Sequence, residues 1–444
     1  MPDTTTAPDA AYDSHFDTVA QRHARALEAL GYRAALLHSG TPPMRFEDDQ
    51  AHPYRANAPF KSWVPLTGAA ESFIYFEPGR TPLLLFHNPA DYWHKPAALP
   101  DAPWVRRFDV RSVGSREAAR AQLPADLGKV AFLGEAFPEL AAWGVGAINP
   151  RPLATRLDYE RAAKTPYELE CLRHASHMGA RGHVAAARAF DGGASEFEIE
   201  LAYLAACRQR EQELPYNPII ALNEGAAVLH YQLLELKAPA ERHSMLIDAG
   251  CEHAGYASDI TRTYSATDTD FATLIDQMDE LQQSLCASVR AGVDWRDVHL
   301  LAHRLISELL LSADIITCEA DEAMETGLSS VFFPHGLGHL LGLQVHDVGG
   351  TLASAEGGEI PRPQGHPFLR LTRVLEPGFV VTMEPGLYFI DALLDEARAD
   401  ARGARINWSR IDGLRKFGGI RIEDNLAVTA GGCENLTRDA FSAS

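Results

Sequence analysis

The sequence predicts an α/β (α+β) protein of two domains, a small N-terminal α/β domain at residues 1–157 and a larger C-terminal domain at 158–444. Its 444 residues suit two or three units of ordinary domain size. Short β-like runs alternate with helical patterns over the first 155 residues. A Pro-containing stretch at 149–153 then precedes a long helical pattern, and farther on carboxylates and histidines interrupt runs that otherwise resemble buried strands.

The first domain begins with an amphipathic helix, which we expect over residues 14–31. Residues 40–66 form a long, Pro-rich loop, and loops of this length are usually functional or mobile. The loop is unusually rich in aromatic and acidic residues for a linker (Phe46, Asp48, Asp49, Tyr54 and Trp63). Five β-like runs begin at Arg33, Ser72, Thr81, Trp104 and Lys129.

The second domain begins with helical spacing from Leu157 to Phe190, within which Pro166 starts the main segment and Thr165 caps it. Residues 193–199 and 292–298 resemble each other. Each run has a Gly, a capping Ser or Asp, and an acidic residue three positions on. Two interpretations remain open: a common capping box that occurs twice, or a duplicated half-domain with a site at the seam.

Composition excludes several function classes. The formal net charge of −20 argues against nucleic acid, because phosphate binding requires clustered Lys and Arg. The six cysteines form no C-x-x-C pair, which favours free thiols over a disulfide framework or a thiolate zinc site. The N-terminal residues lack a signal-peptide pattern, and no run approaches the roughly 18 apolar residues of a membrane helix. We therefore expect a cytoplasmic protein without a membrane partner.

Two aspartates lie in a predicted β-hairpin. Residues 245–250 (MLIDAG) and 256–264 (YASDITRTY) both resemble strands, and a short CEHAG segment joins them. Burying an unpaired carboxylate costs several kcal/mol, so Asp in such strands needs a partner. Neighbouring arms of a hairpin would bring Asp248 and Asp259 together.

Three histidines, His335, His339 and His346, occur within twelve residues (HGLGHLLGLQVH). A single histidine in an apolar segment is usually a core residue, whereas three together favour a site. The glycines between them are expected to let the backbone approach a ligand or ion closely.

Two glutamates complete the set. Glu384 interrupts a buried-type strand (VVTMEPG), and Glu423 lies two residues from Arg421 on one face of another strand (GIRIED). The arginine would keep its neighbouring carboxylate ionised and oriented. Four carboxylates and one imidazole suit Mn²⁺ or Co²⁺. Two divalent ions would balance the four negative charges, and sites of this kind often hold two ions.

The ordered motifs IDAG, SDITRTY, HGLGHLLG-x-x-VHD, MEPG and GIRIED resemble the proline-specific metallopeptidases of the pita-bread fold. The resemblance covers most of the chain from about residue 160. It implies a pita-bread catalytic domain with pseudo-twofold halves and two metal ions, most often Mn²⁺. By resemblance Asp259 and Glu423 bridge the ions, Asp248 binds one, and His339 with Glu384 binds the other.

Within this family the chain is most similar to the bacterial prolidases and their relative, organophosphorus acid anhydrolase. The segments FEDDQAHPYRANAPFKSWVP, YNPIIALNEGAAVLHY and GHPFLRLTRVLEPGFVVTMEPG carry this similarity. It implies hydrolysis of the imide bond of Xaa-Pro dipeptides, with His230 and Tyr216 near the substrate and Arg370 bound to its carboxylate. Gly225 departs from the pattern and is expected to alter pocket size. The subgroup also implies a homodimer in which residues 40–66 cap the partner's site.

The expected mechanism uses a metal-bridging hydroxide, with Glu384 as the proton shuttle. His335 and His346 would contact the substrate or the tetrahedral intermediate, and Arg421 would hold the ligand carboxylates. Three alternatives remain: an aminopeptidase acting on longer peptides, an organophosphate triester hydrolase, and a binding module without metals. The intact ligand set argues against the last.

Overall fold

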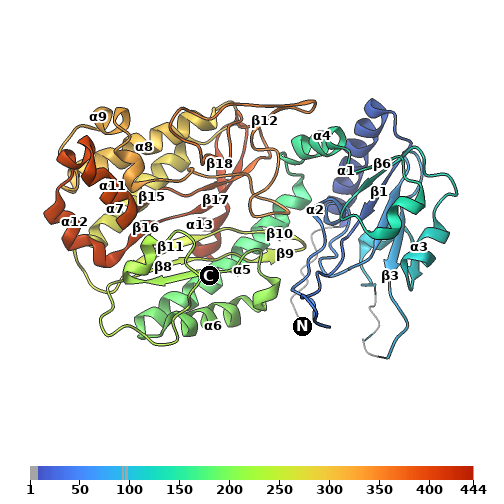
Figure 1. Ribbon diagram of the computed structural model, residues 1–444, viewed down its shortest axis with the longest axis horizontal. Coiled ribbons are helices and arrows are strands. Elements are labelled where there is room, and N and C mark those ends of the chain that lie inside the picture. The colour runs from blue at the N-terminus through green and yellow to red at the C-terminus, as the bar shows by residue number, and fades with distance from the viewer. Residues whose placement is uncertain (1–8, 93–94, 96–98, 444) are drawn as a thin grey trace. The chain divides into compact units, whose positions relative to one another are not determined.

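The computed structural model describes residues 9–92, 95 and 99–443 (Figure 1). The chain divides into two compact units. The first comprises the chain through residue 161 together with residues 165–171 and 354–358, and the second comprises 162–164, 172–353 and 359–444.

The N-terminal unit contains a six-stranded mixed sheet in the order β4-β3-β2-β1-β5-β6. β1 pairs antiparallel with β2 and parallel with β5. As expected for strands in the middle of a sheet, the central strands are buried apolar segments. The strands are β1 (Ala34–His38), β2 (Phe73–Phe76), β3 (Leu83–His87), β4 (Asp109–Val113), β5 (Val130–Leu133) and β6 (Ala147–Ile148). Four of the five predicted strands are therefore confirmed at β1, β2, β3 and β5.

The fifth strand prediction is wrong in its first half. Pro103–Arg107 forms a 3₁₀ helix, and the strand begins only at Asp109. Pro103 occupies the first turn, where its missing N–H and fixed φ favour a helical start over a strand ladder.

The helices of this unit are α1 (Asp9–Leu30), α2 (Ala58–Lys61), α3 (Arg116–Gln122) and α4 (Arg151–Arg161), with a second 3₁₀ helix at Pro138–Trp143. The predicted helix over 14–31 is the main part of α1, which packs against α4 (Figure 1). In the long loop, Trp63 is buried and its ring contacts Phe16 and Phe76, whereas Phe46 is 91% exposed. The loop is thus held at both ends, by Gly40 and Thr41 at its start and by Trp63 near its end, and is exposed in its middle.

The helix predicted from Leu157 to Phe190 is two helices, α4 and α5 (Pro166–Asp191). Thr165 caps α5 as predicted: its backbone N–H donates to Glu168 Oε2 (2.7 Å), and its Oγ1 accepts from the Glu168 N–H (3.4 Å). This capping box explains the interruption, because the Ncap residue lies outside the helical conformation.

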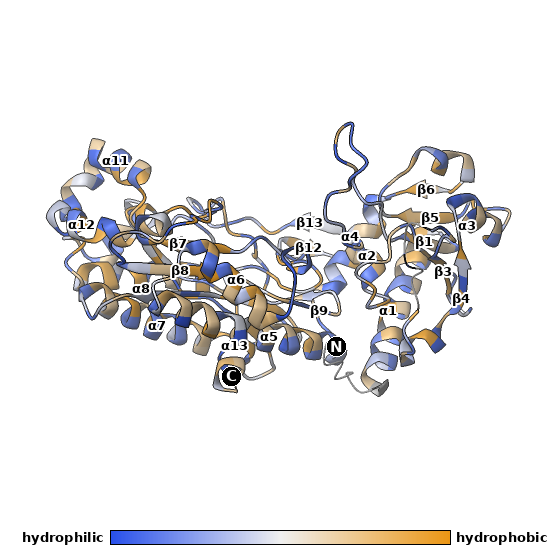
Figure 2. Cartoon of the chain, turned by 90° about the horizontal axis from the view of Figure 1, so that it is seen from below, coloured by the Kyte–Doolittle hydropathy of each residue, from blue (hydrophilic) through white to orange (hydrophobic). Residues whose placement is uncertain are grey.

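The C-terminal unit packs helices on one side of its strands. α7 and α8 lie side by side there (Figure 2). Met278, Ile306 and Val381 belong to its largest apolar core, which joins these helices to β14. The helices are α6 (Glu196–Cys207), α7 (Asp270–Ser288), α8 (Trp295–Ser312), α9 (Ala320–Glu325), α10 (Ser329–Phe332), α11 (Asp391–Ala399), α12 (Trp408–Leu414) and α13 (Leu436–Ser442).

The strands of this unit form small antiparallel sheets in the orders β11-β8-β7, β14-β17-β18 and β15-β16. The pairs β9-β10 and β12-β13 are hairpins. The bounds are β7 (Ile219–Leu222), β8 (Ser244–Asp248), β9 (Glu252–His253), β10 (Tyr256–Ala257), β11 (Thr261–Ser265), β12 (Leu352–Ser354), β13 (Gly357–Glu359), β14 (Val380–Met383), β15 (Gly386–Tyr388), β16 (Gly419–Arg421), β17 (Asp424–Val428) and β18 (Cys433–Asn435).

All six cysteines are free thiols, and five of them are buried. Among the described residues, no helix combines the length and apolar character needed to span a bilayer.

Candidate metal centre

The predicted hairpin brings Asp248 and Asp259 together. β8 and β11 pair antiparallel with Asp248 opposite Thr261, and Asp259 lies two residues before that partner. Between β8 and β11 the chain continues into the short β9-β10 hairpin, which turns at Ala254 and Gly255, both with positive φ. The two arms of the hairpin are therefore longer than predicted. The Tyr216 hydroxyl lies 2.8 Å from Asp248 Oδ1 and 2.6 Å from Asp259 Oδ1, so both carboxylates converge on one point.

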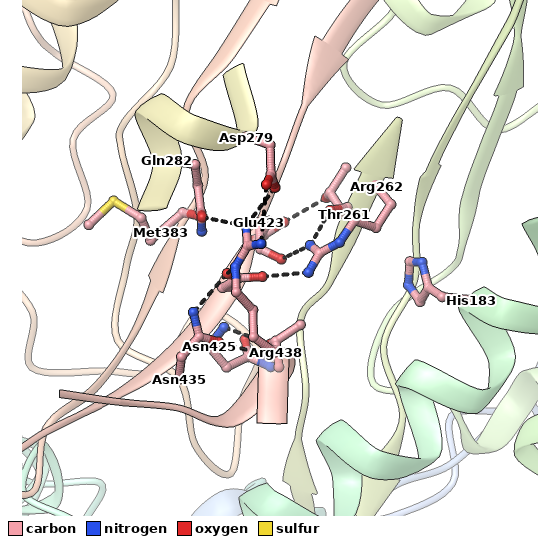
Figure 3. A network of polar contacts seen from close by, with 12 residues as sticks. His183, Thr261, Arg262, Asp279, Gln282, Met383, Glu423, Asn425, Asn435 and Arg438 are labelled. Atoms are coloured by element: carbon pink, nitrogen blue, oxygen red, sulfur yellow. Dashed lines mark hydrogen bonds and ion pairs between the residues drawn. The ribbon is translucent and has the colours of Figure 1, made fainter. Parts of the chain in front are cut away.

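A second strand pair positions Glu384 and Glu423. β14 and β17 pair with Met383 opposite Asp424, so the two glutamates lie together just beyond the paired ends. A single strand was predicted to carry both Arg421 and Glu423, but it is interrupted between them. Glu423 lies outside the β14–β17 pairing and forms an isolated bridge to Thr261 instead. Its N–H donates to the Thr261 carbonyl (3.0 Å), and Thr261 Oγ1 donates to Glu423 Oε2 (2.7 Å) (Figure 3).

His339 presents one nitrogen to this cluster. Its Nδ1 lies 3.0 Å from the Leu340 carbonyl, which places the ring proton on that nitrogen. Nε2 then faces Asp259 Oδ2 (3.4 Å) and Glu384 Oε1 (3.6 Å). The backbone N–H and carbonyl of His339 bond to Thr382, two residues before Glu384. A backbone-held imidazole with a free nitrogen between carboxylates is typical of a metal ligand.

Electrostatics also favour cations at this point. Burial raises the pKa of Glu384 to about 7, and nearby Asp259 contributes, although His339 opposes the shift. Burial and the other three carboxylates raise the pKa of Glu423 well above its ordinary value. Burial likewise raises the pKa of Asp248, despite Arg421. Four crowded carboxylates, of which Asp259 and Glu423 are buried, cannot all ionise cheaply beside one arginine unless positive charge is added. Oxygen donors with one imidazole therefore fit divalent ions, and ligand atoms of Asp259, His339 and Glu423 lie within 4.8 Å of one another.

Arg421 links the cluster to His335. The guanidinium donates to Asp248 Oδ2 (2.7 Å), Thr261 Oγ1 (3.2 Å) and the Tyr388 hydroxyl (2.9 Å). That hydroxyl lies 2.8 Å from His335 Nε2, and His335 Nδ1 lies 2.9 Å from the Gly336 carbonyl. With its proton on Nδ1, His335 accepts from Tyr388. Burial lowers the pKa of His335 to about 3, so the ring is neutral.

A polar network lies behind the ligand strands (Figure 3). Arg262 donates to the carbonyls of Thr261 and Glu423, each at 2.8 Å. It also donates to the buried carboxylate of Asp424 (2.7 Å), which accepts a second bond from Arg438 (2.7 Å). Burial would raise the pKa of Asp424, but these two arginines lower it. The network fixes the backbone on both sides of Glu423.

All the predicted site residues line one cavity of about 830 Å³. His346 lies at its edge with its ring centroid 4.5 Å from that of His339, and burial lowers its pKa to about 4. His230 and Arg370 are exposed on the wall. Within the described chain, the Arg370 guanidinium has no hydrogen-bond or ion-pair partner, so it is available to an incoming anion. The residues that line this cavity and were predicted are Tyr216, His230, Asp248, Asp259, His335, His339, His346, Arg370, Glu384, Arg421 and Glu423.

Sequence reasoning missed Tyr388 and Thr261, which join the ligands to one another. The signal for Tyr388 was a phenol within an apolar strand segment, because a buried hydroxyl needs a partner. The role predicted for the glycines stays a prediction. Gly336 and Gly338 line the cavity, and a Cβ at Gly338 would meet the Thr382 carbonyl oxygen, so this glycine also permits close backbone packing. A Cβ at Gly225 would lie 3.2 Å from the Tyr231 ring, so a larger residue there requires that ring to move.

Comparisons with known proteins agree with this geometry. Residues 170–430 match the model of metallopeptidase family M24, and residues 10–159 match that of the Xaa-Pro dipeptidase N-terminal domain. An Xaa-Pro dipeptidase of Stenotrophomonas maltophilia (strain K279a) is 50% identical over 440 residues, 98% of each chain. One from Xanthomonas axonopodis pv. citri is 48% identical over 436 residues, covering 97% of this chain and 98% of the relative.

Solved structures support the fold. The aminopeptidase PepP of Pseudomonas aeruginosa superposes with a TM-score of 0.72 at 24% identity, covering 96% of this chain and 98% of that one. A zinc-substituted aminopeptidase P of E. coli in complex with product gives 0.70 at 25% identity, with 95% of each chain covered. The pita-bread fold expected from the sequence is confirmed.

Proposed function

We infer that this chain, which belongs to metallopeptidase family M24, is a hydrolase that cleaves Xaa-Pro dipeptides with the help of divalent metal ions. The relatives at about half identity match nearly the whole chain, including both domains. The observation that carries this function in the molecule is the convergence of four carboxylates and one imidazole in a cavity that also contains an unpaired guanidinium.

For the metal site we propose Asp248, Asp259, His339, Glu384 and Glu423 as ligands of two ions, with Asp259 and Glu423 shared. Mn²⁺ is the expected ion and Co²⁺ the alternative, because oxygen donors predominate. When bound, such ions lower the pKa of a shared water and supply hydroxide at neutral pH. Arg421 holds Asp248 in place, and Thr261 holds Glu423.

The proton transfer is assigned to Glu384. Its raised pKa, about 7 in the chain without ions, and its position 3.6 Å from His335 Nδ1 place a carboxyl beside a neutral imidazole. His335 and His346 face the same cavity and are proposed to hold the substrate carbonyl region. Tyr388 fixes the orientation of His335 through its hydroxyl.

We assign the selection of substrate length to Arg370. His230 and Tyr216 lie on the rest of the cavity wall. A guanidinium binds a carboxylate bidentately, and such a charge-assisted pair contributes roughly 1.5–3 kcal/mol. In a dipeptide the carboxylate is on the proline itself, whereas in a tripeptide it lies one residue farther out. Tyr216 lies closer to the metal ligands than to an open substrate pocket, because its hydroxyl contacts Asp248 and Asp259.

The remaining expectations are also proposals. We propose a division into an N-terminal domain (residues 1–157) and a catalytic domain (158–444), a cytoplasmic location and a homodimer. The six free thiols fit a reducing compartment. The exposed Met44 and Phe46 in the 40–66 loop fit a contact with a second copy. Light scattering tests the dimer: a species of one 48.5 kDa chain with full activity contradicts it.

The function is tested by product analysis on Xaa-Pro, Xaa-Pro-Yaa and Xaa-Ala with added Mn²⁺. Release of proline from Xaa-Pro alone, abolished by a chelator and restored by Mn²⁺ or Co²⁺ better than by Mg²⁺, is expected. Cleavage of the tripeptide at the same rate would favour an aminopeptidase. Hydrolysis of a phosphotriester would be a side activity of the same hydroxide, and activity that survives complete metal removal would refute the assignment.

A further inference from the structure

Three histidines form a second cluster outside the carboxylate site. His299 and His303 lie one turn apart on α8, and His366 lies in the loop that leads to Leu369 and Arg370. The ring centroids are 4.5 to 4.7 Å apart, and His299 Nε2 lies 3.0 Å from His366 Nδ1. One nitrogen from each ring lies within 4.8 Å of the other two.

Two nitrogens of this cluster are buried without partners. His299 and His303 are each 1% exposed. Among the described residues, His299 Nδ1 and His303 Nε2 have no hydrogen-bond partner. Leaving a buried polar atom without a hydrogen bond destabilises the fold, and buried polar groups in native proteins usually have a partner. The other nitrogen of His303 lies 2.9 Å from Ser329 Oγ. With its proton donated there, Nε2 keeps a free lone pair.

We propose that His299, His303 and His366 bind a third divalent ion of the zinc class, separate from the carboxylate site. Three imidazoles without a carboxylate favour zinc over manganese. Two nitrogens bound to one tetrahedral ion at 2.0–2.1 Å lie about 3.3 Å apart, so the pair at 3.0 Å needs only a small separation.

The surroundings suit such an ion. The three histidines line a cavity of about 210 Å³ with Phe368 and Arg402, which leaves room for a fourth, solvent ligand. Burial, with the other rings nearby, lowers the pKa of His299 to about 2 and that of His303 to about 3. The imidazoles are therefore neutral, as metal binding requires. Ser329 provides the outer hydrogen bond that orients a ligand histidine.

The ion would tie the 361–371 loop to α8. His366 precedes Arg370 by four residues, and Leu369 is buried between them. The alternative is a metal-free cluster in which one proton is shared between His299 and His366. That arrangement satisfies the hydrogen bond but leaves His303 Nε2 unpaired, whereas an ion bound by the facing nitrogens of His299 and His366 also gives His303 Nε2 a partner.

The test counts ions in the purified, Mn²⁺-loaded protein after equilibration with Zn²⁺. Wild type should hold one more ion per chain than His366→Gln or His303→Gln. The control His177→Gln, which removes a helical histidine of α5 outside the cluster, should match wild type. His366 is only partly buried and lies in a loop, so His366→Gln is expected to fold. It provides the test if His303→Gln fails to fold.

Two further measurements separate this site from the proposed catalytic centre. A variant carrying Asp259→Asn and Glu423→Gln should lose the carboxylate-site ions and retain the third. Bound Zn²⁺ should slow amide exchange at 361–371 in wild type but not in His366→Gln. Equal metal content in wild type and both histidine variants would overturn the inference, whatever the carboxylate site holds.

Discussion

Proton release on metal binding gives a direct test of the carboxylate cluster. The perturbation is Glu384→Gln in the metal-free protein. Burial raises the pKa of Glu384 to about 7, so this carboxyl is mostly protonated at pH 6. A metal ligand must be ionised, and binding at Glu384 therefore releases that proton. The Gln variant has no such proton to lose.

The magnitude follows from the pKa. The difference between the ordinary 4.5 and about 7 corresponds to about 3 kcal/mol for ionising this group in the metal-free fold. Because the folded-state pKa is raised, the contribution of this proton to stability is complete below pH 4.5 and is lost as the pH rises through about 7. Displacing the proton costs about 1.4 kcal/mol at pH 6 and about 0.4 kcal/mol at pH 7, so this group alone lowers the apparent metal affinity about fivefold between pH 7 and pH 6.

Calorimetry in buffers of different ionisation enthalpy measures the proton count directly. On Mn²⁺ binding at pH 6, wild type should release about one proton more than Glu384→Gln, and the difference should vanish by pH 8. Glu376→Gln is the control, because Glu376 is half-exposed and paired with Arg373 at 2.9 Å. Equal proton release at pH 6 from wild type and a Glu384→Gln variant that still binds Mn²⁺ would refute the reasoning.

Three other substitutions test separate parts of the site. Arg370→Ala should lower kcat/KM on Xaa-Pro by about ten- to hundredfold while leaving neutral phosphotriesters little affected, and equal losses would make Arg370 structural. Lys164→Met removes the buried ion pair between Lys164 Nζ and Asp347 (3.0 Å) and should cost about 3–5 kcal/mol in denaturant unfolding. Arg438→Ala removes a partner of Asp424 and should weaken Mn²⁺ binding about 10- to 100-fold in titrations; unchanged binding would limit the network to stability.

The sequence predicted individual strands and motifs better than the tertiary contacts between them. Strand runs such as those at Ser72 and Lys129 were found because buried strands are continuous apolar segments. The proposed ligands were selected because carboxylates and a histidine interrupt such segments and because the ordered motifs resemble a family, and the structure brings these residues into one cavity. The start of the main helix at Pro166 was found because a cap residue and a proline at the first helical position mark a helix start, although the residues on both sides have helical spacing.

The contacts that unite the site could not be read from spacing. Thr261 and Glu423 are 162 positions apart, yet their bond joins the two strand pairs. Tyr388 contributes through a hydroxyl whose partners, Arg421 and His335, lie on other segments. Pairwise contacts of this kind depend on tertiary packing, which periodicity does not encode.

The arrangement of the two strand pairs helps to decide between the two interpretations of the internal repeat at residues 193–199 and 292–298. Ser195 caps α6 and Asp294 caps α8, and each helix is followed by a three-stranded antiparallel sheet. The first sheet and its adjoining loop supply Asp248 and Asp259, while the ends of the second supply Glu384 and Glu423. This correspondence favours a duplicated half-domain over two chance capping boxes. Each half brings two negative charges to the seam, so the proposed divalent ions would offset a repulsion that neither half experiences alone. Besides activating water, ions at this position would therefore stabilise the joining of the two halves.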